Sequence, residues 1–389
     1  MFLDFDLSEA EADYLLRFLD RLDVAWLSTV ARSTQEELRE MFRHRNQGLP
    51  QDLRVNFITG YYNIAAGYKL LLQREGRYPM IYALGGWDLE AVCSFDPFTR
   101  VWAPGPSMPT ARSNHRAVGV DGRIWAVGGV SYVRSGAHSE VECFDTRSQS
   151  WASHAPLTQP RYNFGCASLD GKLYAVGGEF AHGFAHGRIS SMEIFDPATN
   201  QWTPGPSLPR ARNGLTLEAV NGKLFAIGGC VDRDDDDDGH MPGQEEEVAV
   251  TPTAEVPLTT VECFDPQTGL WSLAAPMNIP RSGHASTVVD GCVIVMGGAT
   301  QDGHVDERAT NTVERFSPTS NTWTMMPSMT FPRDNFGAAT WHGTVIAVGG
   351  FSTGQTGEWF RVLPGQQDAS WVQTPDMENT QLGLCVASA

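Results

Sequence analysis

The stretch Tyr174-Ala-Val-Gly-Gly178 decides the fold, because five close variants of it occur elsewhere in the chain. Each variant is an apolar run that ends in two glycines. The six pairs are Gly85-Gly86, Gly128-Gly129, Gly177-Gly178, Gly228-Gly229, Gly297-Gly298 and Gly349-Gly350. Self-similarity at a regular period is the signature of a repeat architecture, in which each unit buries its faces only against its neighbours. The sequence therefore predicts six structural repeats.

Aromatic and arginine positions keep step with the glycine pairs. One tryptophan follows each pair, at Trp102, Trp151, Trp202, Trp271, Trp323 and Trp371, and each of the first five lies 26 residues before the next pair. A phenylalanine lies seven residues before each of these five, at Phe95, Phe144, Phe195, Phe264 and Phe316. An arginine lies ten residues after each, at Arg112, Arg161, Arg212, Arg281 and Arg333, whereas Gln381 takes this position after Trp371. We expect the glycines and tryptophans to be structural, with tryptophan filling the space between units.

Each repeat reads as four short antiparallel strands. Tight turns are predicted at Asp121-Gly122, Asp170-Gly171, Asn221-Gly222 and Asp290-Gly291, with His342-Gly343 at the fifth such position. Asp-Gly and Asn-Gly favour two-residue hairpins because both residues need positive φ. A hairpin, the Gly-Gly pair, a variable loop, a strand with phenylalanine and a strand with tryptophan make one propeller blade.

The phase of the repeat predicts how the ring closes. The first unit begins near Tyr78 with its second strand and has no first strand before it. After Trp371 the chain supplies one more segment that resembles a first strand, Gln381 to Ala389. We therefore expect the C-terminal segment to complete the first blade.

These glycine, aromatic and tryptophan positions resemble the Kelch repeat over residues 78–389. The resemblance implies a mostly β fold, a six-bladed Kelch-type β-propeller with a small helical N-terminal segment. It also implies a protein-binding scaffold or adaptor, which recruits substrates to a ubiquitin ligase or binds a cytoskeletal partner. No cofactor and no catalytic residue are expected for that role.

The alternative is a sugar-modifying enzyme on the same fold, similar to a sialic-acid epimerase or mutarotase, or to an oxidase. An oxidase of that kind needs a copper site, but His115, His154 and His284 are not at ligand spacing. An epimerase-like role needs charged groups at the channel mouth. The candidates for those groups are Arg161, Arg333 and Asp334.

Length variation points to the binding surface. From the second glycine to the phenylalanine the six intervals are 9, 15, 17, 35, 18 and 10 residues, so nearly all variation lies in the loop between the second and third strands. Variable loops on a constant scaffold commonly carry function. In Kelch propellers these loops share a face with the segments after the recurrent arginine. We therefore expect a protein or peptide ligand to contact Ser113, Asn114, Tyr162, Asn163, Phe164, Asn213, Ser282, Asp334, Asn335 and Phe336. The competing interpretation is that these residues end strands and that the arginines bind carbonyl groups between blades.

An acidic insert at residues 231–258 lengthens the fourth of these loops and is expected to be disordered. Val231 to Glu255 holds ten acidic residues against Arg233. The residues Asp234, Asp236, Asp238 and Glu245 match a calcium-loop spacing, with Gly239 at the turn. However, five consecutive aspartates meet half of that pattern trivially, so we expect no specific metal site. A solubilising loop and a contact with a basic partner are the other interpretations.

Residues 1–77 are predicted to be helical, with capping boxes at Ser8-x-x-Glu11 and Thr34-x-x-Glu37. Tyr68-Lys-Leu-Leu-Leu72 resembles the end of a BACK domain, which precedes the propeller in Kelch-like adaptors, and a helical cap or an oligomerisation segment is the other interpretation. The net charge is −18, and no basic stripe or 18-residue apolar stretch occurs, so we expect no nucleic acid or membrane partner. The acidic start, Met1 to Leu16, is unlike a secretory signal, and the seven cysteines contain no C-x-x-C pair. Both features favour a cytoplasmic location.

Overall fold

The computed structural model describes residues 80–388 apart from 87, 97–100, 132, 134–135, 183–184, 233–254, 301–308, 342, 351–355, 363–369 and 375–384. The chain divides into two compact units, Met1–Tyr78 and Pro79–Ala389, and the described residues belong to the second. The helical prediction for 1–77 and the calcium-loop residues fall outside this description. Within it, no helix is long and apolar enough to cross a membrane.

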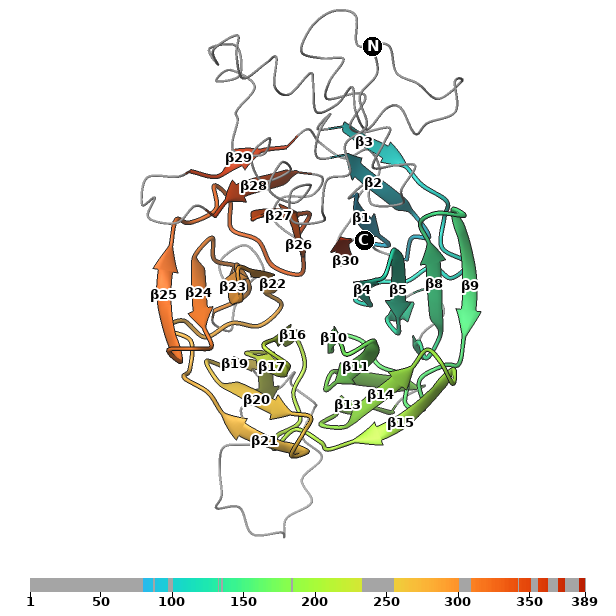
Figure 1. Cartoon of the computed structure of the whole chain (residues 1–389), viewed down its shortest axis with the longest axis horizontal. Coiled ribbons are helices and arrows are strands. Elements are labelled where there is room, and N and C mark those ends of the chain that lie inside the picture. The colour runs from blue at the N-terminus through green and yellow to red at the C-terminus, as the bar shows by residue number, and fades with distance from the viewer. Residues whose placement is uncertain are drawn as a thin grey trace, which may run out of the picture. The chain divides into compact units, whose positions relative to one another are not determined.

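The second unit is a six-bladed β-propeller, as the repeat predicted (Figure 1). Each blade is a four-stranded antiparallel sheet, with its first strand at the centre of the ring and its fourth at the rim. Blades 2 and 3 are β4 (Arg116–Val120), β5 (Arg123–Val127), β8 (Val141–Asp145), β9 (Ser150–His154), and β10 (Gly165–Leu169), β11 (Lys172–Val176), β14 (Met192–Asp196), β15 (Gln201–Gly205). Blades 4 and 5 are β16 (Thr216–Val220), β17 (Lys223–Ile227), β20 (Val261–Asp265), β21 (Leu270–Leu273), and β22 (Ala285–Val289), β23 (Cys292–Met296), β24 (Val313–Ser317), β25 (Thr322–Met326). Blade 6 is β26 (Gly337–Trp341), β27 (Thr344–Val348), β28 (Gly357–Arg361), β29 (Val372–Gln373).

Blade 1 is built from both ends of the propeller. Its second to fourth strands are β1 (Ile81–Leu84), β2 (Val92–Asp96) and β3 (Val101–Pro104). Its first strand is β30 (Cys385–Ser388), which pairs antiparallel with β1 from Ile81↔Ser388 to Leu84↔Cys385. The predicted closure by the C-terminal segment is therefore confirmed.

The turns between first and second strands have the predicted geometry. Asp121 and Gly122 have φ values of 49° and 72°, and Asp170-Gly171, Asn221-Gly222 and Asp290-Gly291 repeat this pattern. Positive φ at both positions matches the right-handed twist of the flanking strands. These turns all lie at one end of the channel, which we call the turn face.

The Gly-Gly pairs let neighbouring blades approach closely. A Cβ atom on Gly128 would lie 2.5 Å from the carbonyl oxygen of Arg161, which belongs to the connection into the next blade. The following amide, that of Gly129, donates a hydrogen bond to the same oxygen at 2.9 Å. No other residue type could bring the strand end so near to this carbonyl.

Aromatic side chains fill the space between blades. In blade 2 the rings of Phe144 and Trp151 are 5.1 Å apart, and Trp151 packs against a cluster that includes Tyr82 of blade 1. The Trp151 indole donates from Nε1 to the carbonyl oxygen of Pro106 in the preceding blade at 3.0 Å. Equivalent bonds come from Trp202, Trp271, Trp323 and Trp371. Tryptophan therefore joins blades both by packing and by a hydrogen bond.

We expect removal of residues 381–389 to destroy cooperative folding. Without β30 the backbone of β1 becomes an unpaired edge next to a central cavity, which favours aggregation. The measurement is a thermal melt followed by circular dichroism and light scattering. Removal of Ala389 alone, beyond β30, is the control and should leave the melt unchanged. A chain lacking 381–389 that melts like the intact protein would disprove closure by β30.

Candidate functional site

The recurrent arginine is fully buried and forms an ion pair inside its blade. Arg281 donates from Nη1 to the carbonyl oxygens of Gly297 and Thr312, at 2.6 and 3.0 Å, and from Nη2 to Oε1 of Glu314 at 3.1 Å. Both side chains of this ion pair are 0% exposed. The same pairing recurs as Arg112–Glu142, Arg161–Glu193, Arg212–Glu262 and Arg333–Glu358. These arginines are therefore structural, but the carbonyl groups that their side chains bind belong to their own blade, which corrects the expectation that they bind carbonyl groups between blades.

In four of the five pairs the glutamate also accepts a hydrogen bond from the connection that enters the blade. Glu314 accepts hydrogen bonds from the backbone and side-chain amides of Asn278, at 2.9 and 2.7 Å. In blade 6 the Thr330 amide donates to Glu358 at 2.7 Å. Burial lowers the pKa of Arg281, and the charge and hydrogen bonds of Glu314 oppose that shift. The sequence contained a signal for this partner, because a glutamate precedes the phenylalanine by two residues in five blades.

We expect Glu314→Gln to destabilise the propeller by about 3–5 kcal/mol, because it leaves the guanidinium of Arg281 buried without a counter-ion. The double change Arg281→Met with Glu314→Met should recover much of this loss, since it removes both charges. Urea unfolding of the three proteins measures the difference. Equal stabilities for the wild type and Glu314→Gln would contradict this role for the pair.

Five equivalent residues form a backbone ring around one end of the channel. Asn114, Asn163, Gly214, Gly283 and Asn335 have φ values between 49° and 64°. Asparagine and glycine tolerate this left-handed conformation best. Each amide donates to the carbonyl oxygen of the preceding member: Asn163 to Asn114, Gly214 to Asn163, Gly283 to Gly214 and Asn335 to Gly283, at 2.7 to 3.1 Å. We call this chain of bonds the mouth ring.

The mouth ring brings part of the expected site together. Asn114, Asn163 and Asn335 are partly exposed at the channel mouth, as the sequence predicted for a common rim. Tyr162 is also partly exposed, and its hydroxyl donates to Oε2 of Glu179 at 2.7 Å. Contact between these four residues and a partner stays a prediction.

Backbone bridges join the arginine segments to the loops between second and third strands, through Ser113, Asn213 and Ser282. Backbone bridges pair these residues with Val130, Cys230 and Ala299, the residues that follow the Gly-Gly pairs. Ser113 and Asn213 are buried, at 2% and 4% exposure. The loops between second and third strands therefore do share one face with the arginine segments, which we call the loop face.

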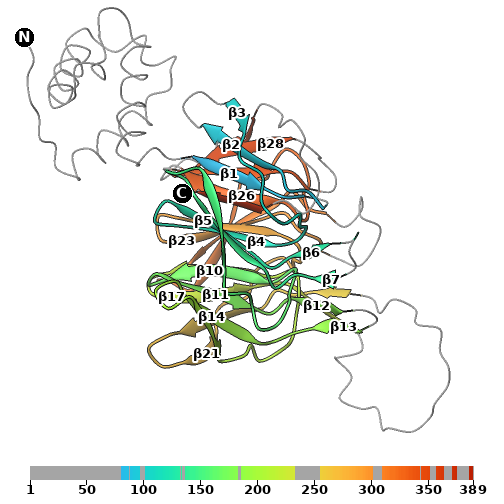
Figure 2. The ribbon, with the colours of Figure 1, turned by 90° about the vertical axis from the view of Figure 1, so that its right-hand side faces the viewer.

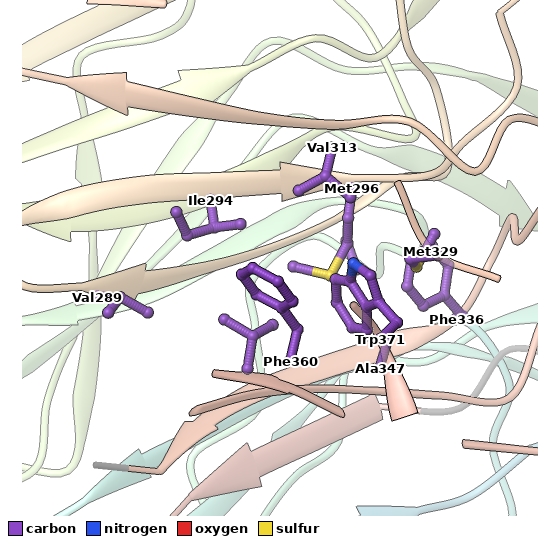
Figure 3. Close-up of a cluster of buried hydrophobic side chains, with 11 residues drawn as sticks. Val289, Ile294, Met296, Val313, Met329, Phe336, Ala347, Phe360 and Trp371 are labelled. Carbon is purple, nitrogen blue, oxygen red and sulfur yellow. The ribbon is translucent and has the colours of Figure 1, made fainter. Parts of the chain in front are cut away.

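Five expected contact residues are corrected by their burial, namely Ser113 and Asn213 together with Phe164, Asp334 and Phe336. Phe164 is 0% exposed in the cluster between blades 2 and 3, and Phe336 is 5% exposed in the cluster shared by blades 5 and 6 (Figure 3). Asp334 is 0% exposed. Both rings sit where the chain turns from the mouth ring into the first strand, so they fill the blade interface and do not offer aromatic surface to a partner.

The enzyme alternative loses its candidate residues for the same reason. Arg161, Arg333 and Asp334 are all 0% exposed, and the two arginines are held by Glu193 and Glu358. A side chain with no exposed surface cannot touch a substrate in the channel. The three histidines that were considered for a copper site have different surroundings. His115 and His284 are buried, whereas His154 packs on Trp125.

His284 occupies the interface position that Phe164 and Phe336 fill elsewhere. Its Nε2 lies 3.0 Å from the hydroxyl of Thr216. Burial and the nearby charge of Arg281 lower the pKa of His284 to about 3. A neutral imidazole is therefore built into the contact between blades 4 and 5.

We expect His284 to make the propeller acid-sensitive. Its folded pKa lies below the unfolded value of about 6.5, so the stability it contributes is complete above that pH and is lost as the pH falls toward 3. The loss should reach about 3 kcal/mol near pH 4.5. His284→Leu, which copies Leu215 of blade 4, should flatten this dependence in urea unfolding measured across pH. The exposed His182→Leu is the control, and an unchanged slope in His284→Leu would refute the assignment.

The loops of blades 2, 3 and 4 build an ordered layer on the loop face. Strands β6 (Val130–Ser131), β7 (Gly136–Ala137), β12 (Glu179–His182) and β13 (Ala185–Arg188) form one sheet in the order β13-β12-β7-β6, which crosses from blade 2 to blade 3. Next comes the ladder of β18 (Cys230–Asp232) with β19 (Glu255–Pro257) from blade 4. Figure 2 shows these loop strands on one side of the propeller. We call them the collar.

Arg188 joins the two parts of the collar. Its guanidinium forms ion pairs with Asp232 and Glu255, the latter at 3.0 Å, and donates from Nε to Asn213 at 3.0 Å. Burial alone would lower the pKa of Arg188, but the bond and charge of Asp232 raise it above its usual value. The insert predicted to be disordered over 231–258 is thus corrected at both ends, which are paired strands, while residues 233–254 lie outside the described residues.

The collar also exposes apolar surface that sequence reasoning missed. Val133, between β6 and β7, is 81% exposed, the highest value among the exposed large hydrophobic residues of the described chain. Phe180 in β12 is partly exposed. The loop intervals of 15, 17 and 35 residues pointed to these loops, but no residue pattern indicated that they pair with one another across blades.

Comparison with known proteins agrees with this architecture. The Kelch motif profile matches residues 111–158, 160–209, 253–278 and 280–330. Kelch-like protein 36 of Rattus norvegicus is 27% identical over 209 residues, which cover 52% of this chain and 30% of that protein. Kelch-like ECH-associated protein 1B of Danio rerio is 34% identical over 95 residues, which cover 24% of this chain and 16% of that protein.

Two further matches complete the comparison. The influenza virus NS1A-binding protein homolog of Mus musculus is 34% identical over 122 residues, 31% of this chain and 15% of that protein. The solved structure of YjhT matches with a TM-score of 0.56 at 16% identity and covers 72% of this chain and 88% of its own, which shows a shared fold. The chain matches less than a third of the length of each of these curated relatives.

Proposed function

The chain is a Kelch-repeat protein, and we propose that its propeller binds a basic segment of another protein through the collar. The observation that carries this proposal is the layer of two sheets on one face of blades 2 to 4, which Arg188 joins through its ion pairs. Its strands extend beyond the blades and are not needed to complete any of the six blade sheets.

The collar offers apolar contact and exposed backbone rather than a deep pocket. Val133 and Phe180 supply apolar atoms on two neighbouring loops. In a protein interface, a few such side chains contribute most of the binding free energy when the partner excludes water from them. A flat, partly apolar strand layer is better suited to a protein surface than to a small molecule.

The charge of the collar favours a basic partner. Glu140 is 53% exposed at its side chain, and Asp232 and Glu255 are 38% and 46% exposed. Arg188, which pairs with the last two, is only 11% exposed, so its positive charge faces inward. The sequence between Asp232 and Glu255 is itself strongly acidic. Lysine and arginine side chains would therefore meet an attractive field on this face.

The relatives support binding as the general role. Two of them are named for association with, or binding to, another protein, and this chain resembles each over part of its propeller. Recruitment of the bound protein to a ubiquitin ligase, as the Kelch resemblance implies, remains the finer proposal. Co-precipitation of a cullin with the full chain tests it separately from the collar.

A site-specific photo-crosslinker at position 133 tests the collar in cell extract. We expect it to capture a protein through a segment rich in lysine and arginine, with capture that weakens as salt rises. Val133→Ser, tested by pull-down of the same protein without the crosslinker, and Glu140→Lys should each reduce capture several-fold without changing the melting curve, because both side chains are exposed.

The matched control is Leu270, which is 68% exposed on the rim strand β21 near the turn face. A crosslinker there, or Leu270→Ser, should leave capture by position 133 unaffected. Capture that survives both collar substitutions but is lost with Leu270→Ser would disprove the collar as the binding surface.

A further inference from the structure

The centre of the propeller holds a chamber that is lined neither by the arginine–glutamate pairs nor by the collar. The chamber has a volume of about 450 Å³ and is lined by side chains from β4, β10, β16, β22 and β26. Chambers of this size are typical of sites for small molecules. Figure 1 shows the first strands arranged around the centre of the propeller.

At the loop face the chamber adjoins a second, much smaller cavity that shares Arg116, His284 and Phe336 with it. Among the described residues, this cavity inside the mouth ring has a volume of about 10 Å³, which is room for a single water molecule. Arg116, the first residue of β4, reaches across this cavity and donates to the carbonyl oxygens of Phe164 and Leu215 at 2.5 and 3.1 Å. A ligand would therefore enter from the turn face, opposite the collar.

One acidic and one basic group face the chamber with unused hydrogen-bonding atoms. Glu218 lies midway along β16, and its Oε1 accepts a hydrogen bond from Ser286 at 2.6 Å. No hydrogen bond within the described residues involves its other carboxyl oxygen or Nη1 of Arg116, and both side chains are partly exposed. Arg116 belongs to blade 2 and Glu218 to blade 4, and along the channel axis they are offset by two strand positions, or about 7 Å. Ser168 and Thr340 add hydroxyl groups to the lining.

We propose that this chamber binds a small zwitterion, with its ammonium group at Glu218 and its carboxylate at Arg116. A ligand that fills the chamber displaces water from both side chains, and a molecule with both charges can pair with both unused atoms so that neither charge is left without a partner. A simple amine would face the guanidinium of Arg116 without compensation, and a simple carboxylate would face Glu218. Amino acids with a short spacer between the two groups are the chemical class that fits.

The protonation of Glu218 couples such binding to pH. Burial raises the pKa of the Glu218 carboxyl to about 7, although Ser286 and Arg116 both oppose the shift. Among the described residues, the other titratable groups that line the chamber are Cys166 of β10 and His284 before β22. His284 stays neutral in this range, because its pKa is about 3. Since an ammonium group needs the ionised carboxylate, affinity should be about 30-fold weaker near pH 5.5 than near pH 8.5.

Titration calorimetry of the full chain with glycine, β-alanine and γ-aminobutyrate tests the proposal. We expect one of these zwitterions to bind at least tenfold more tightly than butylamine or butyrate, and binding below pH 7 to release a proton into the buffer. No heat with any zwitterion, or equal affinity for butylamine, would overturn the proposal. Because collar variants do not line the chamber, failure here leaves the proposed function of the collar untouched.

Glu218→Gln is the decisive variant, since it keeps the shape and the bond to Ser286 while removing the charge. It should weaken binding of the preferred zwitterion at least tenfold and abolish both the proton release and the pH dependence. Asp290→Asn, an exposed change in a turn that asparagine tolerates, is the control and should bind as the wild type does. Binding by Glu218→Gln with an unchanged pH profile would show that this carboxylate does not hold the ligand.

Discussion

Five buried arginine–glutamate pairs are the interaction on which the rest of the propeller depends. Each arginine binds the Gly-Gly carbonyl or a neighbouring carbonyl of its own blade through its side chain. Through its own carbonyl, each of four accepts from the second glycine of the preceding blade, as Arg161 does from Gly129. One residue thus links two blades. The glutamate is required because a guanidinium buried without a counter-ion would cost several kcal/mol.

The first blade differs from the other five in both members of this pair. Cys93 stands two residues before Phe95, where the other blades carry glutamate, and Gln381 stands where the recurrent arginine is expected. Cys93 is buried in the apolar cluster between blades 1 and 6. Loss of both charges together avoids a lone buried ion at the junction where the two ends of the propeller meet.

The buried arginine–glutamate pairs also explain why we expect function elsewhere than at the recurrent arginine segments. The arginine and glutamate side chains are buried in contacts within the propeller. In the mouth ring, asparagine occurs because it tolerates the left-handed backbone conformation. The residues that can vary without breaking these contacts lie in two places. They are the loops between second and third strands, which build the collar, and the inward side chains of the first strands, which line the chamber. The two surfaces lie at different places on the same scaffold, so each can change without disturbing the other.

The sequence by itself determined the six blades, their strand order, the tight turns and the closure by the last residues, because local spacing and turn chemistry specify these features directly. It did not distinguish buried from exposed residues within the arginine segments. Phe164 and Phe336 looked like binding residues next to Asn163 and Asn335, but a single backbone turn sends each ring into the core. Tertiary structure alone decided the pairing of the collar strands and the meeting of Glu218, Ser286 and Arg116 from three blades. The reason is that these contacts join residues dozens of positions apart, whose proximity depends on the closure of the whole ring.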